Sequence, residues 1–285
     1  MANSIIYAED WAVKAQERLD KPTTWKDVCK VEYTNSRVLN NPYTTDATVQ
    51  TTARGSAYTH QDVVVTNEAI TINQVGNIAQ FIDRADLAQT DYAKQMDLAE
   101  SQGTLLDEFL ETKMLAAHAS WTDFDNASIG GGAGNISVSI SNIDDIVRGI
   151  KREIGEANGR KRMQRDGAFI VWREADLEIL EAYAQANGFQ LADKALKDGV
   201  APGYFFLGMY HYVSNSHTAG HLFAGVRKAF HLGIVKDTWG LVTVVQNPAV
   251  IGGGAISGIG VDMRVDFAFK AWAKVAPILF DVLVA

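Results

Sequence analysis

Hydrophobic and polar positions follow two different periods within residues 59–119. From Val63 to Ile78 apolar side chains alternate with polar ones, which is typical of strands with one covered face. From Asp91 onward apolar residues recur every three or four positions and predict one long amphipathic helix. Thr90 and Asp91 would supply its N-cap and acidic first turn. A helix of about 25–28 residues would span roughly 40 Å, which is long for a chain of this size.

The predicted helix separates its residues into two faces. Its apolar stripe consists of Tyr92, Met96, Ala99, Leu106, Phe109, Leu110, Met114 and Ala117. The positions mostly off the stripe are Lys94, Asp97, Glu100, Asp107, Glu108 and Glu111. We therefore expect the first set to be buried and the second to face water.

The segment before residue 46 has few large apolar side chains and reads as an arm. A short helix is expected from Ile5 to Leu19, and Pro22 and Pro42 interrupt any longer element. The apolar groups are too sparse for a separate core, so we expect them to dock against the body or a neighbouring subunit. These groups are Ile5, Ile6, Trp11, Val13 and Trp25. Residues 46–60 are rich in Thr, Ser and Ala, which favours an exposed two-stranded excursion with its tip at residues 54–56.

Strand and helix patterns alternate after residue 140. A helix is expected over residues 141–159, with Ile143, Val147, Ile150 and Ile154 buried and Asn158-Gly159 as its left-handed stop. A buried strand is expected over residues 168–172 and a helix over residues 174–187. Residues 189–203 read as a surface loop. This alternation predicts a compact α/β subdomain.

The last third of the chain is dominated by strand patterns. Residues 230–235 and 241–245 read as strands separated by a turn at residues 237–240. Strict alternation from Val261 to Phe269 marks the clearest strand of the chain. The apolar tail from residue 271 to 285 should be buried or paired.

Composition narrows the function classes. A chain of 285 residues with 47% hydrophobic residues can bury a sizeable core. Its net charge of −8 argues against a dedicated nucleic-acid-binding protein. One cysteine, Cys29, excludes an intramolecular disulfide. No segment resembles a signal peptide or a membrane anchor, so no membrane partner is expected.

A basic run and two glycine runs invite a chemical interpretation. The basic run Arg160, Lys161, Arg162 and Arg165 carries no interleaved aromatics, so a solvated turn or an inter-subunit salt-bridge site is favoured over nucleic-acid binding. The glycine runs at residues 130–134 and 252–254 lack the sequence context of phosphate or dinucleotide loops. Both glycine runs therefore read as connectors.

His211, His217 and His221 lie close together in sequence. Their irregular spacing across a strand end does not ensure convergence on a metal ion, which favours isolated histidines. Ser214 and Ser216 lie nearby, but neither stands in a nucleophile elbow. The sequence thus assigns no catalytic, cofactor-binding or metal-binding residue and implies no cofactor.

The order of these elements resembles the major capsid proteins of tailed bacteriophages, which have the HK97-type shell fold. The resemblance is carried by the extended segment, the acidic turn at residues 83–86, the long helix, the stretch 203–216 and the closing segment 258–285. It implies an α+β fold with an N-terminal arm (1–45), an extended β loop (46–82) and a peripheral domain with a spine helix (83–135). An axial α/β domain (136–257) and a return strand to the peripheral domain (258–285) complete the implied division.

The resemblance also implies a function and partners. Copies of the chain would assemble into an icosahedral shell of pentamers and hexamers around double-stranded DNA, without sequence-specific binding and without enzymatic activity. Scaffolding, portal and decoration proteins are the other expected partners, and the virion is the expected location after assembly in the host cytoplasm. The alternatives are an encapsulin-like nanocompartment and an oligomeric metal-dependent enzyme using the His211 to His221 region.

Two further expectations concern processing. Some family members cross-link through a lysine in the extended loop, but here no lysine lies between Lys30 and Lys94, so we expect no such cross-link. The short stretch before the loop implies no fused scaffolding domain and no large N-terminal removal.

Overall fold

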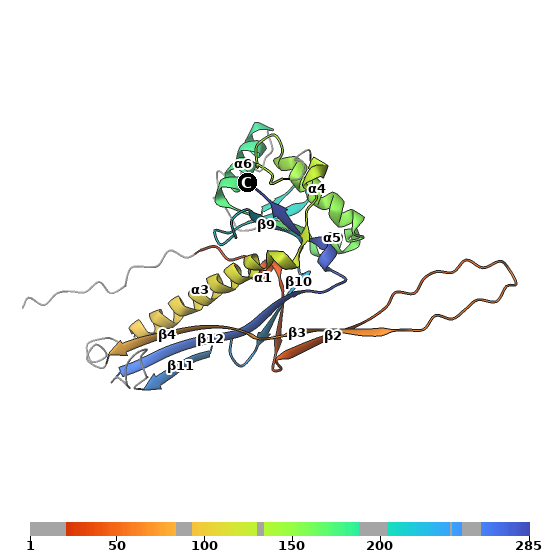
Figure 1. The fold of residues 1–285 in the computed structure, drawn as a ribbon. Coiled ribbons are helices and arrows are strands. Elements are labelled where there is room, and N and C mark those ends of the chain that lie inside the picture. Colours follow the sequence, from red (N-terminus) through yellow and green to blue (C-terminus); the bar gives the residue numbers. More distant parts are fainter. Residues whose placement is uncertain (1–20, 84–92, 130–133, 188–203, 240, 247–257) are drawn as a thin grey trace, which may run out of the picture.

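The computed structural model describes residues 21–285 except 84–92, 130–133, 188–203, 240 and 247–257. Figure 1 shows a long helix lying along an elongated sheet, a rounded α/β lobe above it, and a hairpin that projects away from both. The predicted arm helix, the N-cap of the long helix, the loop at 189–203 and most of both glycine runs lie outside the described residues.

An elongated five-stranded sheet forms the base of the molecule. Its strands are β1 (Lys30–Thr34), β4 (Gln74–Asp83), β10 (Phe230–Val235), β11 (Leu241–Gln246) and β12 (Gly258–Ala271). β12 is the central strand, because it pairs antiparallel with β4 along one edge and with β11 and then β10 along the other. β1 adds to β10 in parallel. The strand expected over residues 261–269 is confirmed and is longer at both ends.

The long helix α3 (Ala93–Leu115) covers one face of this sheet (Figure 1). Phe109 of α3 meets Phe267 of β12 edge-on, with ring centroids 5.6 Å apart. Gly76 of β4 permits this close approach, because a Cβ there would lie 2.7 Å from Phe109 Cε1. Leu106, Leu110 and Met114 are buried as expected, but Glu108 and Glu111 are buried as well. The predicted exposure of these two carboxylates is therefore wrong, because both accept backbone hydrogen bonds from the start of the described chain.

A two-stranded sheet projects from the base. β2 (Val38–Thr44) and β3 (Val65–Thr71) pair antiparallel from Val38↔Thr71 to Thr44↔Val65. The alternating stretch from Val63 to Ile78 is thus two strands, β3 and β4, with a break at residues 72–73. β2 begins before the predicted start of the extended loop at residue 46. β4, predicted as part of that loop, belongs to the five-stranded sheet instead.

The rounded lobe contains a six-stranded sheet in the order β5-β13-β9-β6-β8-β7. Its strands are β5 (Thr122–Asp123), β6 (Ala168–Trp172), β7 (Tyr204–Phe206), β8 (Met209–Val213), β9 (His221–Val226) and β13 (Leu279–Leu283). The helices of the lobe are α4 (Ile143–Glu156), α5 (Arg160–Asp166) and α6 (Glu174–Ala186). The described residues also form short elements: α1 (Trp25–Val28) and the 3₁₀ turns η1 (Ala116–Ser120), η2 (Asn126–Ile129) and η3 (Ala276–Ile278).

Several predictions for the lobe, made from local sequence patterns, are confirmed. The expected stripe of α4 is fully buried, and Asn158 adopts a positive φ of 59° where a left-handed stop was predicted. All five residues of β6 are buried, as a central strand requires. The apolar tail is paired, because β13 lies between β9 and β5.

Two features differ from the sequence interpretation. The basic run forms helix α5 and not a turn, and Asp166 at its end pairs with Arg162 one helical turn earlier and with the adjacent Arg165. Some strands also belong to a different sheet from the one that the predicted domain division implies. β10 and β11, expected in the axial segment, pair with β12, whereas β13, expected with the peripheral segment, pairs with β9.

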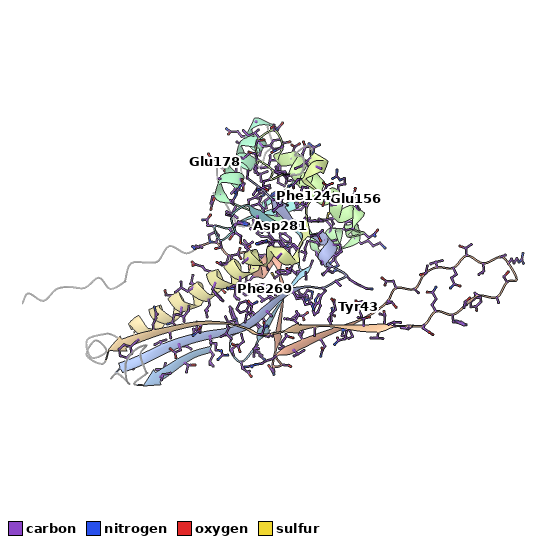
Figure 2. The ribbon with its side chains drawn as sticks, viewed as in Figure 1. Tyr43, Phe124, Glu156, Glu178, Phe269 and Asp281 are labelled. Carbon is purple, nitrogen blue, oxygen red and sulfur yellow. The ribbon has the colours of Figure 1, made fainter. Side chains whose placement is uncertain are left out.

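One hydrophobic core joins the two parts of the molecule, since its buried residues come from α3, the lobe and β12 alike. Figure 2 shows this arrangement, with Phe269 near the long helix, Asp281 inside the lobe and Tyr43 at the root of the projecting hairpin. The lobe and the base are therefore packed against each other.

Candidate assembly surface

The projecting hairpin exposes apolar side chains that its own chain does not cover. Val49, Tyr58 and Val63 are 93%, 71% and 74% exposed. Its two legs are joined beyond the paired strands by the Thr45–Val64 backbone bond and by Gln61, which bonds both backbone groups of Thr48. An isolated two-stranded hairpin is marginally stable in water, so this one would gain stability by lying on another surface.

The root of the hairpin is fixed to the body. The Lys274 ammonium pairs with Asp46 at 3.0 Å and also bonds the Thr44 carbonyl. Lys270 donates to the Ala69 carbonyl at 2.8 Å, and the carboxylate of Glu68 accepts the Ala273 N–H. These contacts set the direction of the hairpin and leave its distal half free of contacts with the body (Figure 1).

A second apolar surface lies on the far edge of the base. Among the described residues β11 pairs only with β12, so its other edge is open. Leu241 and Val244 are 57% and 59% exposed. An open apolar edge strand is an aggregation hazard in a monomer and is normally covered by another chain or segment.

The two unexpectedly buried carboxylates hold the start of the described chain against α3. Glu111 accepts the Thr24 and Trp25 N–H groups, each at 2.9 Å, and the Thr24 hydroxyl at 2.7 Å. Glu108 accepts the Lys21 N–H at 2.9 Å. Burial raises the pKa of Glu111, and the hydrogen bonds from Thr24, Ser214 and Trp25 oppose that rise.

This contact explains part of the predicted arm. Trp25 is fully buried within the same chain and meets Trp239 edge-on at 5.8 Å. Of the five apolar arm residues named from the sequence, Trp25 therefore docks against the body. The other four lie outside the described residues. Sequence periodicity could not predict the burial of Glu108 and Glu111. Their hydrogen-bond partners lie more than eighty residues earlier in the chain, and a helix pattern reports only on nearby residues.

A groove of about 760 Å³ runs beside α5 and the hairpin root. Arg162 and Arg165 of the basic run line it, together with lysines from α1, β1 and two turns. These lysines are Lys26, Lys30, Lys228 and Lys274. Glu68 and Asp166 also line the groove, but its basic side chains outnumber these two carboxylates, which favours an acidic partner group.

The three histidines named from the sequence do not converge. His211 is buried in β8, where Nδ1 accepts the Trp172 indole N–H at 2.9 Å and Nε2 lies 3.0 Å from the Phe206 carbonyl. Burial lowers the pKa of His211 to about 4 and that of His217 to about 4. Both rings are thus neutral near neutral pH.

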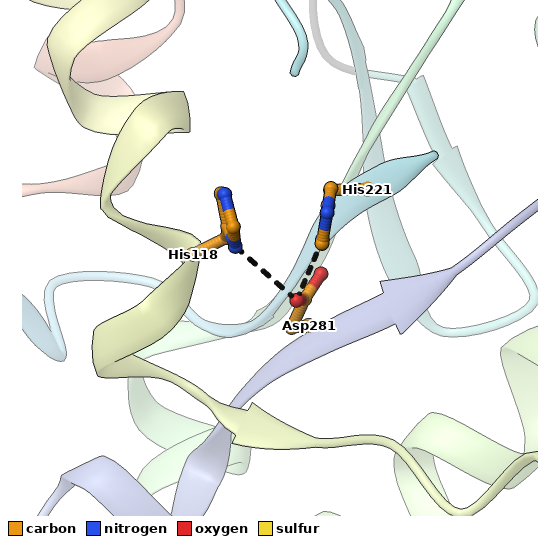
Figure 3. Close-up of side chains that lie close together, drawn as sticks. All are labelled: His118, His221 and Asp281. Atoms are coloured by element: carbon orange, nitrogen blue, oxygen red, sulfur yellow. Dashed lines mark hydrogen bonds and ion pairs between the residues drawn. The ribbon is translucent and has the colours of Figure 1, made fainter. Parts of the chain in front are cut away.

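His221 instead meets two residues that the sequence did not single out. His221 Nδ1 lies 2.8 Å from Asp281 Oδ2, and His118 Nδ1 lies 3.7 Å from the same oxygen (Figure 3). The imidazole rings stack with centroids 3.8 Å apart. Burial raises the pKa of Asp281, while the hydrogen bond from His221 opposes the rise. His118 follows the long helix and Asp281 lies sixty residues after His221, so no local motif links them.

Comparison with known proteins identifies the fold. The sequence matches no protein-family model and no curated protein. Solved structures match over nearly the whole length. The structure titled "Mycobacterium phage Che8" is 15% identical, with a TM-score of 0.69 over 99% of this chain and 98% of that chain. "Capsid of native GTA particle computed with C5 symmetry" is 10% identical, with a TM-score of 0.67 over 98% and 96% of the two chains.

A third structure, "Asymmetric unit of bacteriophage PhiM1 mature capsid", is 10% identical, with a TM-score of 0.61 over 98% of this chain and 92% of that chain. The chain therefore has the mixed α and β fold of phage capsid structures, as the resemblance implied. Among the described helices, none is both long and apolar enough to cross a membrane.

Proposed function

We propose that this chain is a major capsid protein of a tailed bacteriophage with the HK97-type shell fold. Copies of it close into an icosahedral shell of pentamers and hexamers that encloses double-stranded DNA. The observation that carries the proposal is the match in fold to phage capsid structures over nearly the full length of both chains. The chain acts in the virion as a structural subunit and not as an enzyme, and it assembles in the host cytoplasm.

The mechanism is geometric. In the proposed shell, the hairpin of one subunit lies across its neighbour and buries Val49, Tyr58 and Val63, which the isolated chain exposes. The open β11 edge and the basic groove offer further contacts, the groove to acidic groups. Such contacts between unlike surfaces of identical subunits generate rings and closed shells by repeated rotation. The net charge of −8 fits a container that holds DNA without reading its sequence.

The test is electron microscopy of the full chain, expressed alone and together with the genes that adjoin its own. The proposal expects shells, or sheets and tubes of pentamers and hexamers, with nuclease-resistant DNA inside particles from infected cells. Shells that carry an enzyme in place of DNA would show a nanocompartment. A monodisperse small oligomer under all of these conditions would contradict the proposal.

A further inference from the structure

Three side chains from separate parts of the fold present metal-ligand atoms to one another. His118 lies in η1, directly after the long helix, His221 begins β9, and Asp281 lies within β13 (Figure 3). Their ligand atoms all lie within 4.8 Å of one another. Neither the capsid fold nor the assembly surface accounts for this arrangement.

The sheet register brings two of the three together. β13 pairs antiparallel with β9, and His221 stands opposite Leu283. Asp281 is two residues from Leu283 and therefore points to the same face as His221, as its diagonal neighbour. The end of the long helix then places His118 over this pair, and its ring stacks on that of His221.

His221 lies at hydrogen-bond distance from Asp281, whereas His118 does not, so a shared cation would replace the His221–Asp281 hydrogen bond and join all three side chains. His118 Nδ1 is 3.7 Å from Asp281 Oδ2, which is too long for a hydrogen bond. Two ligands of one tetrahedral zinc ion, with bonds of about 2.0–2.2 Å, lie about 3.3–3.6 Å apart. The observed separations of 2.8 and 3.7 Å lie on either side of that range.

The carboxylate supplies a second, independent observation. Asp281 is 4% exposed, and its Oδ1 is buried without a hydrogen-bond partner among the described residues. A buried carboxylate oxygen without a partner is costly, and a bound cation would satisfy it. The two histidine side chains keep 27% and 24% of their surface exposed, which leaves an entry path and room for a water ligand.

We propose that His118, His221 and Asp281 bind one zinc-class divalent cation, which ties the end of the long helix to β9 and β13. Two imidazoles and one carboxylate are ligands that suit Zn²⁺, Co²⁺ or Ni²⁺, whereas Mg²⁺ and Ca²⁺ favour sites made of oxygen atoms. The inference concerns the folded chain itself and stands whether or not the chain builds a shell.

The test is a titration of the full-length, EDTA-treated protein with Co²⁺ and Zn²⁺, read by calorimetry and by the visible spectrum of bound Co²⁺. The parent protein should bind one ion per chain, with a tetrahedral cobalt spectrum and a higher Tm. H118Q, H221Q and D281N should each weaken binding at least about tenfold. H60Q, which alters an exposed hairpin histidine, should bind as the parent does.

Circular dichroism of the metal-free variants separates loss of binding from loss of folding. H118Q is the safest variant because its side chain is partly exposed at a helix end. The proposal is overturned if the folded parent binds no more Co²⁺ than H118Q does, or if H118Q and H221Q both retain parental affinity. A cluster that responds to pH but not to Zn²⁺ would also overturn it, because the triad would then be an ion pair only.

Discussion

Replacing Glu111 by Ala is the sharpest single test of how the N-terminal segment is held. In the folded chain one carboxylate accepts hydrogen bonds from two backbone N–H groups, from the Thr24 hydroxyl and from the Ser214 side chain. Thr24 and Trp25 are 1% and 0% exposed, so water cannot replace the lost acceptor without local opening. Glu111→Ala therefore removes the acceptor from all of these buried donors.

The size of the effect follows from those donors. An unsatisfied buried donor costs about 1–3 kcal/mol, and such costs do not add fully within one network. We expect Glu111→Ala to lower the free energy of unfolding by about 4 kcal/mol, and Tm by roughly 10 °C. The same opening should expose the peptide bond after Lys26 to trypsin.

The assay is thermal unfolding by circular dichroism together with limited trypsin digestion. Glu111→Gln is the matched control, because it keeps the shape and an acceptor oxygen, and it should cost about 1–2 kcal/mol. A Glu111→Ala protein within about 0.5 kcal/mol of the parent would show that these donors do not depend on the carboxylate, since that is the range of surface substitutions. Equal losses in both variants would refute the role of the hydrogen bonds.

Three further predictions test the histidines, the hairpin and the lobe. Because the pKa of His211 is about 4 in the folded chain and about 6.5 when unfolded, the unfolded state binds the extra proton between these pH values. Stability should therefore fall by up to about 3 kcal/mol per such histidine as pH drops from 6.5 to 4, and H211Q should flatten this slope in pH-dependent urea unfolding. Val64→Asp on the exposed hairpin should abolish assembly, measured by light scattering. It should change the free energy of unfolding of the monomer by less than about 0.5 kcal/mol. Thr51→Asp, at another exposed position, is the charge-matched control. Gly225→Ala should cost more than about 3 kcal/mol in a thermal melt, because φ is 153° and the new Cβ would lie 2.5 Å from the Ile278 carbonyl oxygen.

Local periodicity was enough to predict the individual elements. The stripe of α4, the strand β6 and the strand β12 each depend on neighbours within a few residues, so their patterns are visible in the sequence. The left-handed stop at Asn158 was predictable for the same reason, since Asn tolerates a positive φ.

Long-range pairing could not be predicted in this way. Nothing local indicates that β13 joins β9, or that β10 pairs with β12, because a strand pattern records which faces are covered and not which strand lies beside it. Glu111 looked like a surface residue because its partners are far away in sequence.

The same limit applies to the candidate metal site. The sequence drew attention to His221, but His118 and Asp281 reach it only through the end of α3 and the β9–β13 register. Of the three proposed ligands, only His221 was named from the sequence, where it was interpreted as an isolated histidine.

The proposed closed shell requires the hairpin of each subunit to lie on a neighbouring subunit. The most direct measurement is cryo-electron microscopy of particles purified from cells that express the full chain. We expect icosahedral shells of pentamers and hexamers, with Val49, Tyr58 and Val63 buried between subunits. Particles in which the hairpin stays in solvent, or a protein that remains a small oligomer, would contradict it.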